Sequence, residues 1–240
     1  MTVIPYKELE EGKKEQVARM FNNISRRYDL LNRVLSLGID ISWRKKAVKI
    51  LKTHNPSTIL DVATGTADFA IAAVKSGAKK ITGVDISEQM LEVGREKITA
   101  LRLNDKIELL SGDSENLSFQ DNYFDAVIVS FGVRNFENLE KGMSEQLRVL
   151  KPGGLLIVLE FSKPSGYFFK HIYNFYFKFI LPSIGKLISK DTSAYRYLPD
   201  SVNAFPYGKA FTAILDKTGF KNTQCKELTF GVSSIYTGIK

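Results

Sequence analysis

The stretch Thr58-Ile-Leu-Asp-Val-Ala-Thr-Gly-Thr-Ala-Asp68 begins with an apolar run, passes one acidic residue and enters a cluster of small residues. A helix-like segment, 69–75, follows it. This order is typical of a buried parallel strand that turns tightly into a helix, where free backbone N–H groups and small side chains let a polar ligand approach closely. The stretch therefore predicts a cofactor site, with Asp61 and Gly65 as its first candidate residues.

Composition places the chain among ordinary soluble proteins. It has 240 residues, of which 44% are hydrophobic and 25% charged, and this is enough for one large α/β domain. The single cysteine, Cys225, cannot form an internal disulfide and offers no metal cluster, so we expect no metal and a reducing compartment. Neither a signal peptide nor an apolar run of the ~20 residues that span a bilayer is found. We expect a cytoplasmic protein.

The formal charge of +8 is compatible with nucleic acid, with an anionic membrane surface or with simple solubility. A solvated basic surface is the commonest of these explanations. Charge alone therefore does not select a partner.

Residues 1–55 are predicted to be a helical cap. Apolar residues recur there at helical spacing, with Asp40 as the expected cap of the second helix. The residues that carry this spacing are Val17, Met20, Phe21, Ile24, Trp43, Ala47, Ile50 and Leu51. Asn55-Pro56 closes the cap and marks the entry to the next region.

From residue 58 onward, strand and helix patterns alternate. The predicted strands are 58–62, 80–84, 107–111, 125–130 and 155–160, with a turn at 151–154. One intervening helix is expected to be capped by Ser87, and the residues on its buried side are Met90, Leu91, Val93, Ile98 and Leu101. Such alternation predicts a mostly parallel, doubly wound sheet with right-handed crossovers.

The alternation breaks at 163–200, which is rich in aromatic residues and is predicted to be an insertion or lid. A helix at 207–217 and two strands, 224–229 and 233–239, then form a C-terminal antiparallel hairpin. We expect a single domain over 1–240, made of the cap 1–55, a cofactor-binding core 56–162, the lid 163–200 and the final helix and hairpin 201–240.

Polar side chains fall at the carboxyl ends of the predicted parallel strands, where ligands bind in such sheets. The loop keeps only Gly65 of the dinucleotide fingerprint, which disfavours NAD. Asp85 is placed to accept hydrogen bonds from a ribose diol, and Asp113 to contact an adenine edge. Together with the terminal hairpin they favour S-adenosylmethionine, although a cap or turn role is about as common for any one carboxylate. The four strand-end residues are Asp61, Asp85, Asp113 and Ser130.

Several longer runs are more specific than the loop. They are Tyr28-Asp29-x-x-Asn32 with Ser36-x-Gly38 and Trp43, Ser130-Phe131-Gly132-Val133-Arg134-Asn135, Arg148-Val149-Leu150-Lys151-Pro152-Gly153-Gly154, Leu159-Glu160-Phe161-Ser162-Lys163-Pro164, Tyr195-Arg196-Tyr197-Leu198-Pro199-Asp200-Ser201-Val202 and Phe205-Pro206. Over nearly its whole length the chain resembles the ubiquinone/menaquinone C-methyltransferase family of class I S-adenosylmethionine-dependent methyltransferases. That resemblance implies a Rossmann-like, seven-stranded α/β fold. The cofactor contacts it implies are Thr66, Asp85, Asp113, Ser114 and Ser130, beside Gly65 and Asp61.

The reaction implied is methyl transfer to a ring carbon of a reduced, isoprenoid-tailed quinone. We expect demethylmenaquinol, because the chain lacks an organelle-targeting extension; the ubiquinone-pathway benzoquinol is the alternative. A phenolate makes the ring carbon a better nucleophile, so a stabilising cation should help. Arg134 is the candidate cation, Asn135 could orient the hydroxyl, and Tyr195 could face the ring. The competing interpretations are a structural ion pair for Arg134, a turn for Asn135 and a buried aromatic for Tyr195.

Other roles stay open. Asp29 is expected to be a cap rather than a proton acceptor, and His54 and His171 ordinary surface residues. The aromatic stretch could be plain core, a channel for the tail, or, through Lys170 and Lys178, an amphipathic segment on the inner face of the cytoplasmic membrane. A homodimer is one alternative for the assembly.

Two rival functions remain. One is methylation of RNA or another small molecule; the Asn-Pro-Pro-Tyr type of base-methylation motif is missing after the fourth strand, so no nucleic-acid partner is expected. The other is a lipid-binding module without catalysis.

Overall fold

A computed structural model of the chain describes residues 3–164, 166, 171 and 193–240. Most of the predicted aromatic lid, including Lys170 and Lys178, lies outside the described residues, as does the side chain of Tyr195. Within the described residues no helix combines the length and the apolarity needed to cross a bilayer.

One seven-stranded sheet organises the molecule, in the order β3-β2-β1-β4-β5-β7-β6. Neighbours among the first five strands run parallel, and β7 pairs antiparallel with both β5 and β6. The strands are β1 (Thr58–Val62), β2 (Lys80–Asp85), β3 (Ile107–Ser111), β4 (Phe124–Ser130), β5 (Leu150–Phe161), β6 (Lys221–Leu228) and β7 (Ser233–Ile239). The predicted fold class, including the C-terminal hairpin, is confirmed. The strand order reverses between β1 and β4, where a doubly wound sheet binds its ligand.

β5 begins earlier than predicted. Residues 151–154 were expected to be a turn, but the strand already pairs at Leu150, opposite Phe124. The next registered pair is Leu155 with Ala126, so the extra residues form an irregularity inside the strand rather than a turn before it. Gly153 has a φ of +78°, which a glycine adopts without strain.

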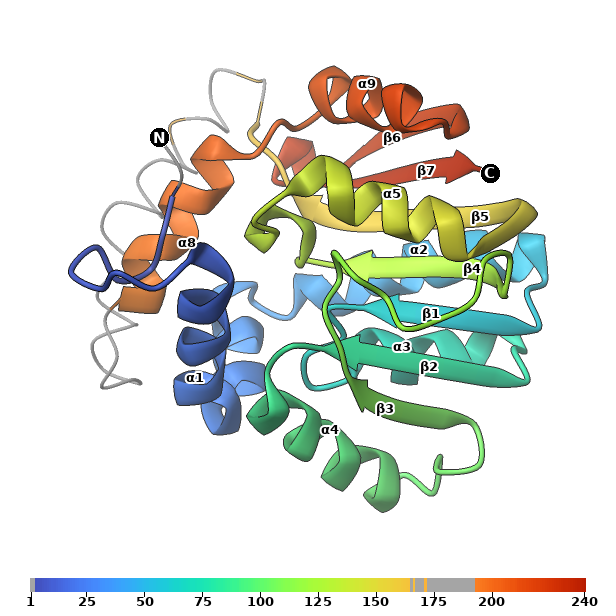
Figure 1. The fold of residues 1–240 in the computed structure, drawn as a ribbon, viewed down its shortest axis with the longest axis horizontal. Coiled ribbons are helices and arrows are strands. Elements are labelled where there is room, and N and C mark those ends of the chain that lie inside the picture. The colour runs from blue at the N-terminus through green and yellow to red at the C-terminus, as the bar shows by residue number, and fades with distance from the viewer. Residues whose placement is uncertain (1–2, 165, 167–170, 172–192) are drawn as a thin grey trace.

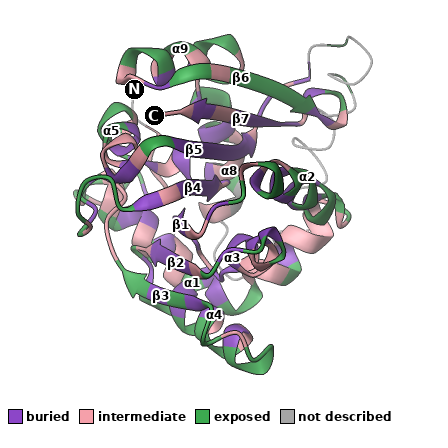
Figure 2. Ribbon diagram, turned by 90° about the vertical axis from the view of Figure 1, so that its right-hand side faces the viewer, coloured by how far each residue is buried: buried purple, intermediate pink, exposed green. Residues whose placement is uncertain are grey.

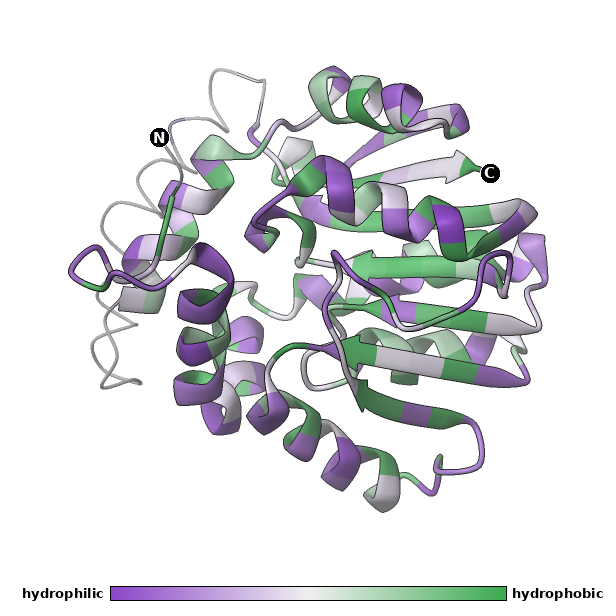
Figure 3. Cartoon of the chain, viewed as in Figure 1, coloured by the Kyte–Doolittle hydropathy of each residue, from purple (hydrophilic) through white to green (hydrophobic). Residues whose placement is uncertain are grey.

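Strand residues alternate between two hydrophobic clusters, one on each face of the sheet. In β4, Ala126 and Ile128 join the cluster that includes residues of α2 (Ile39–His54), α3 (Asp68–Ala73) and α4 (Glu88–Ala100). Val127 and Val129 join the cluster beneath α5 (Leu139–Val149) and α9 (Lys209–Thr218). The central strands are therefore buried and hydrophobic, as Figures 2 and 3 show, while the edge strands β3 and β6 are more exposed.

Helix ends confirm one cap and correct three predictions. Ser87 caps α4, since its hydroxyl accepts from the backbone N–H of Met90 at 3.3 Å. Asp40 is not the cap of α2; Gly38 precedes the helix, and Asp40 lies buried in the first turn, paired with Arg44. Leu101 is 54% exposed rather than buried, because α4 ends at Ala100. The third correction is Asp29, which lies inside a helix and caps none.

Two helices cross the carboxyl ends of the parallel strands: α1 (Lys13–Leu35) and α8 (Ser193–Ala204). In Figure 1 they stand on the left, facing the ends of β1, β2 and β4. α8 runs through the predicted boundary at residue 200. The first helix of the N-terminal cap, α1, thus lies over the carboxyl ends of the parallel strands, where the candidate site residues are found.

Candidate functional site

The loop after β1 is pinned to the end of β2. Gly65 has a φ of +55°, in the left-handed region, and its N–H donates to Asp85 Oδ2 at 2.8 Å. The other carboxylate oxygen of Asp85 accepts from the Ser87 N–H at 2.8 Å. Burial raises the pKa of Asp85, and these backbone hydrogen bonds oppose the rise. Each oxygen of a carboxylate accepts more than one hydrogen bond, so Asp85 keeps capacity for a diol.

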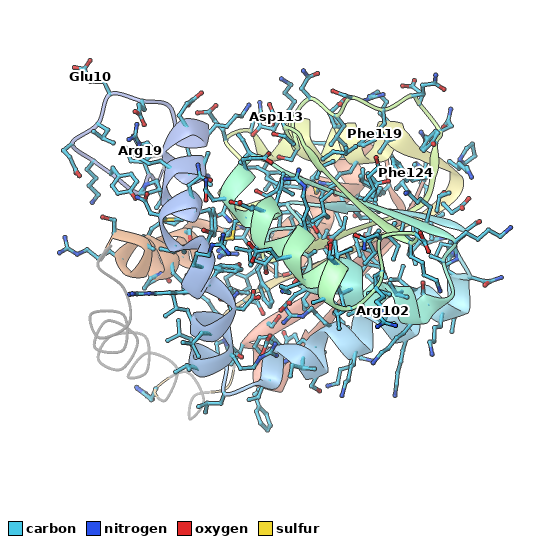
Figure 4. All side chains as sticks on the ribbon, turned by 90° about the horizontal axis from the view of Figure 1, so that it is seen from below. Glu10, Arg19, Arg102, Asp113, Phe119 and Phe124 are labelled. Atoms are coloured by element: carbon cyan, nitrogen blue, oxygen red, sulfur yellow. The ribbon has the colours of Figure 1, made fainter. Side chains whose placement is uncertain are left out.

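The loop after β3 is tied to α1. Asp113 Oδ2 accepts from Lys14 Nζ at 2.7 Å, and Oδ1 accepts from the Glu115 N–H at 2.9 Å. Partial burial acts to raise the pKa of Asp113, but the hydrogen bond from Lys14 and the one from the backbone outweigh it and hold the pKa below its usual range. Figure 4 shows Asp113 beside α1, far from Arg102 at the opposite end of the sheet.

These loops enclose a cavity of about 80 Å³, here called the polar cavity. The candidate residues that line it are Gly65, Asp85, Asp113, Ser114, Ser130 and Asn135. Two of them carry buried side-chain atoms without a hydrogen-bond partner among the described residues: Ser130 Oγ and Asn135 Oδ1. Leaving such a group unpaired costs about 1–3 kcal/mol, so the cavity suits a ligand with several polar groups.

Two expected contacts do not line this cavity. Asp61 is 1% exposed and accepts from Thr64 Oγ1 at 2.7 Å; burial raises its pKa to about 7. The hydroxyl of Thr66 donates to Asp29 at 2.5 Å and accepts from Lys97 at 3.3 Å. Both residues instead hold the loop in place: Asp61, near the end of β1, accepts from Thr64 of the loop, and Thr66 is tied to Asp29 of α1 and Lys97 of α4.

α1 is attached to the core at both of its ends. Near its start, the Lys13 ammonium donates to the Phe136 carbonyl at 2.6 Å, beside the Lys14–Asp113 pair. Near its end, Asp29 forms an ion pair with Lys97 of α4 at 2.7 Å. The helix α1 therefore covers the polar cavity. Lys14 was missed by sequence reasoning, because its partner lies 99 residues away along the chain.

A second cavity, of about 400 Å³, lies between α1, α2 and α8 and is here called the apolar cavity. It shares three walls with the polar cavity: Phe21, Tyr28 and Phe131. The other residues that line it are mostly apolar and include Met20, Ile24, Leu31, Leu35, Leu37, Ile39, Trp43, Phe161, Leu198 and Val232. Its polar members include Arg134 and Tyr197. The two cavities therefore meet beside the ends of β1 and β4.

Arg134 is both buried and paired. Its side chain is 7% exposed and forms an ion pair at 2.9 Å with Glu160, whose side chain is fully buried. The guanidinium also donates to the Phe131 carbonyl and lies 5.4 Å from the centre of the Phe161 ring. Its Nε has no partner among the described residues, so this N–H remains unused as a donor. The ion pair that was the competing interpretation is present, at the wall of the apolar cavity.

Glu160 and Tyr197 were not singled out from the sequence. Burial raises the pKa of Glu160 while the Arg134 charge and hydrogen bonds oppose this rise. Burial likewise raises the pKa of Tyr197 to about 12, and its hydroxyl has no partner among the described residues. A usable signal existed for Glu160, since a carboxylate that interrupts the apolar run 155–161 must find a partner. Tyr195 lies in α8, and its side chain is outside the described residues.

No group of three or more acidic, histidine or cysteine side chains suited to a metal ion occurs in the described part of the chain. The donor set around the two cavities is one of hydroxyl, amide, carboxylate and guanidinium groups, which suits an organic ligand.

Solved structures with a similar fold include an S-adenosylmethionine-dependent methyltransferase from Thermotoga maritima. It has 21% identity and a TM-score of 0.63, and the match covers 92% of this chain and 99% of that one. A methyltransferase from Aquifex aeolicus matches with 20% identity and a TM-score of 0.57, over 80% of this chain and 87% of that one. At these identities the likeness establishes the class I fold alone, since the [4+2]-cyclase SpnF also matches, with a TM-score of 0.57.

Sequence relatives are much closer. A demethylmenaquinone methyltransferase of Bacteroides fragilis is 50% identical over 96% of this chain and 95% of its own length. The ubiquinone/menaquinone biosynthesis C-methyltransferase UbiE of Geotalea daltonii is 48% identical over 95% of this chain and 97% of its own length. The model of one methyltransferase family matches residues 9–240, with both cavities inside the match. The chain belongs to the ubiE/COQ5 methyltransferase family.

Proposed function

We propose that this chain methylates a ring carbon of demethylmenaquinol, a reduced quinone with an isoprenoid tail, in menaquinone biosynthesis. As a member of its family it is an S-adenosylmethionine-dependent C-methyltransferase of quinone biosynthesis. One observation carries the proposal: a polar cavity at the strand ends meets a larger apolar cavity across the shared walls Phe21, Tyr28 and Phe131. Transfer from a polar methyl donor to an acceptor with a hydrophobic isoprenoid tail requires a polar site and an apolar site side by side.

The polar groups that line the polar cavity suit those of S-adenosylmethionine. Asp85 would accept from the ribose diol, while Asp113 and Ser114 would meet the adenine edge. The unpaired Ser130 Oγ and Asn135 Oδ1 would gain partners from the remaining polar groups. When bound, the cofactor supplies a methyl group already activated on a sulfonium. Thr66 and Asp61 are proposed to hold the loop that carries Gly65 rather than to contact the cofactor.

In the apolar cavity the protein's task is to orient the ring and favour its phenolate form. The Arg134 guanidinium stays protonated at neutral pH, so it stabilises a phenolate instead of accepting the proton. Glu160 fixes the guanidinium against the wall, and the Nε donor stays available to a ring oxygen. Apolar side chains around the ring exclude water, which strengthens this electrostatic contact. Tyr195 is proposed to complete the ring site from α8.

The test is methyl transfer with labelled S-adenosylmethionine and chemically reduced demethylmenaquinone, with the reduced ubiquinone-pathway benzoquinol as the second substrate. We expect label on the ring of demethylmenaquinol and a large loss in Arg134→Ala. Arg148→Ala is the matched control, because Arg148 forms its ion pairs with Glu145 and Asp121, neither of which lines a cavity. Cofactor binding by calorimetry without label transfer to either quinol would overturn the proposal.

The benzoquinol is the second candidate substrate, because relatives named for both pathways, such as UbiE of Geotalea daltonii, are 48% identical to this chain. Faster turnover of the benzoquinol in the same assay would select it.

We further propose that the protein works in the cytoplasm at the inner face of the cytoplasmic membrane, from which a quinol with an isoprenoid tail must be drawn. The basic formal charge of +8 supports contact with an anionic surface. Sedimentation of the purified protein tests the remaining alternative, a homodimer.

A further inference from the structure

The turn between α1 and α2, together with the first turn of α2, presents apolar side chains to solvent. Leu37 is 81% exposed, and Ile39 and Ile41 are 37% and 41% exposed. Leu37 has a φ of +51°, a left-handed conformation that glycine and asparagine adopt far more readily than leucine. An exposed leucine in a disfavoured conformation gives no stability to the fold, so its position calls for another explanation.

This turn lies at an opening of the apolar cavity. Leu37 and Ile39 line the cavity although both are exposed, which is possible only where the cavity wall reaches the surface. A molecule that enters here passes between these side chains before it reaches Arg134. The rim of the opening is therefore apolar, unlike the polar rim of a site that admits solutes from water.

The outer face of α2 continues from this rim and is strongly basic. Its exposed side chains include Ile41 followed by four lysines: Lys45, Lys46, Lys49 and Lys52. None of these lysines forms an ion pair or hydrogen bond with a described residue, whereas all three lysines of α1 and α4, Lys13, Lys14 and Lys97, are paired. The only carboxylate in the helix, Asp40, is buried and already paired with Arg44. Figure 2 shows exposed residues along the outer side of α2.

We propose that the Leu37 turn and the lysine face of α2 together dock the protein on an anionic lipid bilayer, with the opening of the apolar cavity facing the membrane. The exposed apolar side chains insert among the acyl chains, and the unpaired lysines meet the lipid phosphates. The inference rests on the proposed function in one respect: a tailed quinol then reaches the ring site without crossing water. It assigns the contact to described residues of the helical cap, not to the aromatic segment.

The first test is binding to vesicles of phosphatidylcholine with and without phosphatidylglycerol, measured by co-sedimentation. We expect binding only with phosphatidylglycerol, and weaker binding at high salt. The triple variant K45Q/K46Q/K49Q should lower the partition coefficient about 100-fold, since each lysine near such a surface contributes about 1 kcal/mol, or roughly 5-fold. The matched control K209Q/K221Q/K226Q removes the same charge from exposed lysines of α9 and β6 and should change binding far less. Equal loss in both triples would overturn the proposal.

The second test separates insertion from charge. Leu37→Asp should abolish vesicle binding, whereas Leu101→Asp, at an exposed leucine directly after α4, should not. If Leu37→Asp leaves vesicle binding intact, or instead dissociates a dimer seen by sedimentation, the surface binds a second copy and the proposal fails. Methyl transfer by the unmodified protein to a short-tailed quinol in solution is measured in parallel. Failed docking and failed methylation are then separate results.

Discussion

Replacing Glu160 by glutamine should destabilise the protein more than a typical single substitution. Glu160 is fully buried, its Oε1 accepts from Arg134 Nη1 at 2.9 Å and from the Phe161 N–H at 2.8 Å, and its Oε2 faces the Arg134 N–H at 3.4 Å. Glutamine keeps the shape and one acceptor oxygen, but it removes the charge. Arg134 then stays buried and charged without a counter-ion, because a guanidinium does not lose its proton at any ordinary pH.

The loss in the free energy of unfolding can be estimated from the unpaired charge that Arg134 keeps. Removing one partner of a buried ion pair costs about 3–5 kcal/mol, and the acceptor that glutamine retains returns roughly 1 kcal/mol. We therefore expect the free energy of unfolding to fall by about 2–4 kcal/mol. Glu140→Gln is the control: its partner Lys217 is 70% exposed, and such surface pairs contribute less than about 1 kcal/mol.

The reciprocal variant, Arg134→Met, should behave differently with pH. Burial already raises the pKa of Glu160, and loss of the Arg134 charge raises it further, so the carboxyl takes up a proton in the folded state. A raised folded-state pKa gives stability that is present at low pH and is lost as pH rises through the folded pKa. Relative to the unmodified protein, Arg134→Met should thus lose most stability at alkaline pH, whereas the loss in Glu160→Gln should not grow with pH.

Urea denaturation of both variants at acidic and alkaline pH checks this reasoning. If the two variants lose the same free energy at both pH values, or if Glu160→Gln loses no more than Glu140→Gln, the pair does not carry the buried charge balance described here.

Three further perturbations bear on the site. Asp85→Asn should weaken S-adenosylmethionine binding by about 10- to 100-fold in calorimetry, the value of a hydrogen bond to a charged acceptor; unchanged affinity would remove Asp85 from the cofactor site. Lys14→Met should alter the free energy of unfolding by less than about 1 kcal/mol, because its partner Asp113 is 30% exposed, yet it should speed cofactor release in stopped-flow experiments by loosening α1. The pKa of Asp61 is raised from 3.8 to about 7, so the unmodified protein should lose stability as pH rises between these values. In Asp61→Asn the free energy of unfolding should fall by roughly 4 kcal/mol less between pH 3.8 and 7 than in the unmodified protein. Urea titrations at several pH values measure this fall, and an unchanged fall would contradict the raised pKa of Asp61.

The sheet could be predicted from the sequence because its signals are local. Apolar runs of strand length, separated by helical periods and turn residues, predict β1 to β4 to within a residue at either end. β5 was harder, since Pro152 and Gly153 are typical of a turn and the pairing that keeps them in the strand depends on Phe124 and Lys240, far away in the sequence. Asp40 and Leu101 were misplaced for a different, local reason: α2 begins just after Gly38, before Asp40, and α4 ends at Ala100, before Leu101.

Of the candidate site, too, some residues could be predicted from the sequence and others could not. Strand-end positions brought Asp85, Asp113 and Ser130 into one cavity, as the topology of a parallel sheet requires. The sequence indicates that Glu160 needs a partner but not that this partner is Arg134, and it gives no signal for Lys14, because in both cases the partner lies on another element.

The position of α1 over the polar cavity depends on side-chain contacts that the hydrophobic periodicity of the sequence does not predict. α1 has the same apolar spacing as many surface helices, yet its polar residues decide where it lies: Lys14 meets Asp113, and Asp29 meets Lys97 and Thr66. Asp113 and Thr66 lie in the loops that carry the candidate cofactor residues, and α1, which covers the polar cavity, also forms a wall of the apolar one. A ligand that displaces Lys14 from Asp113 must therefore also loosen one wall of the neighbouring cavity, and occupancy of the two sites should be coupled through α1.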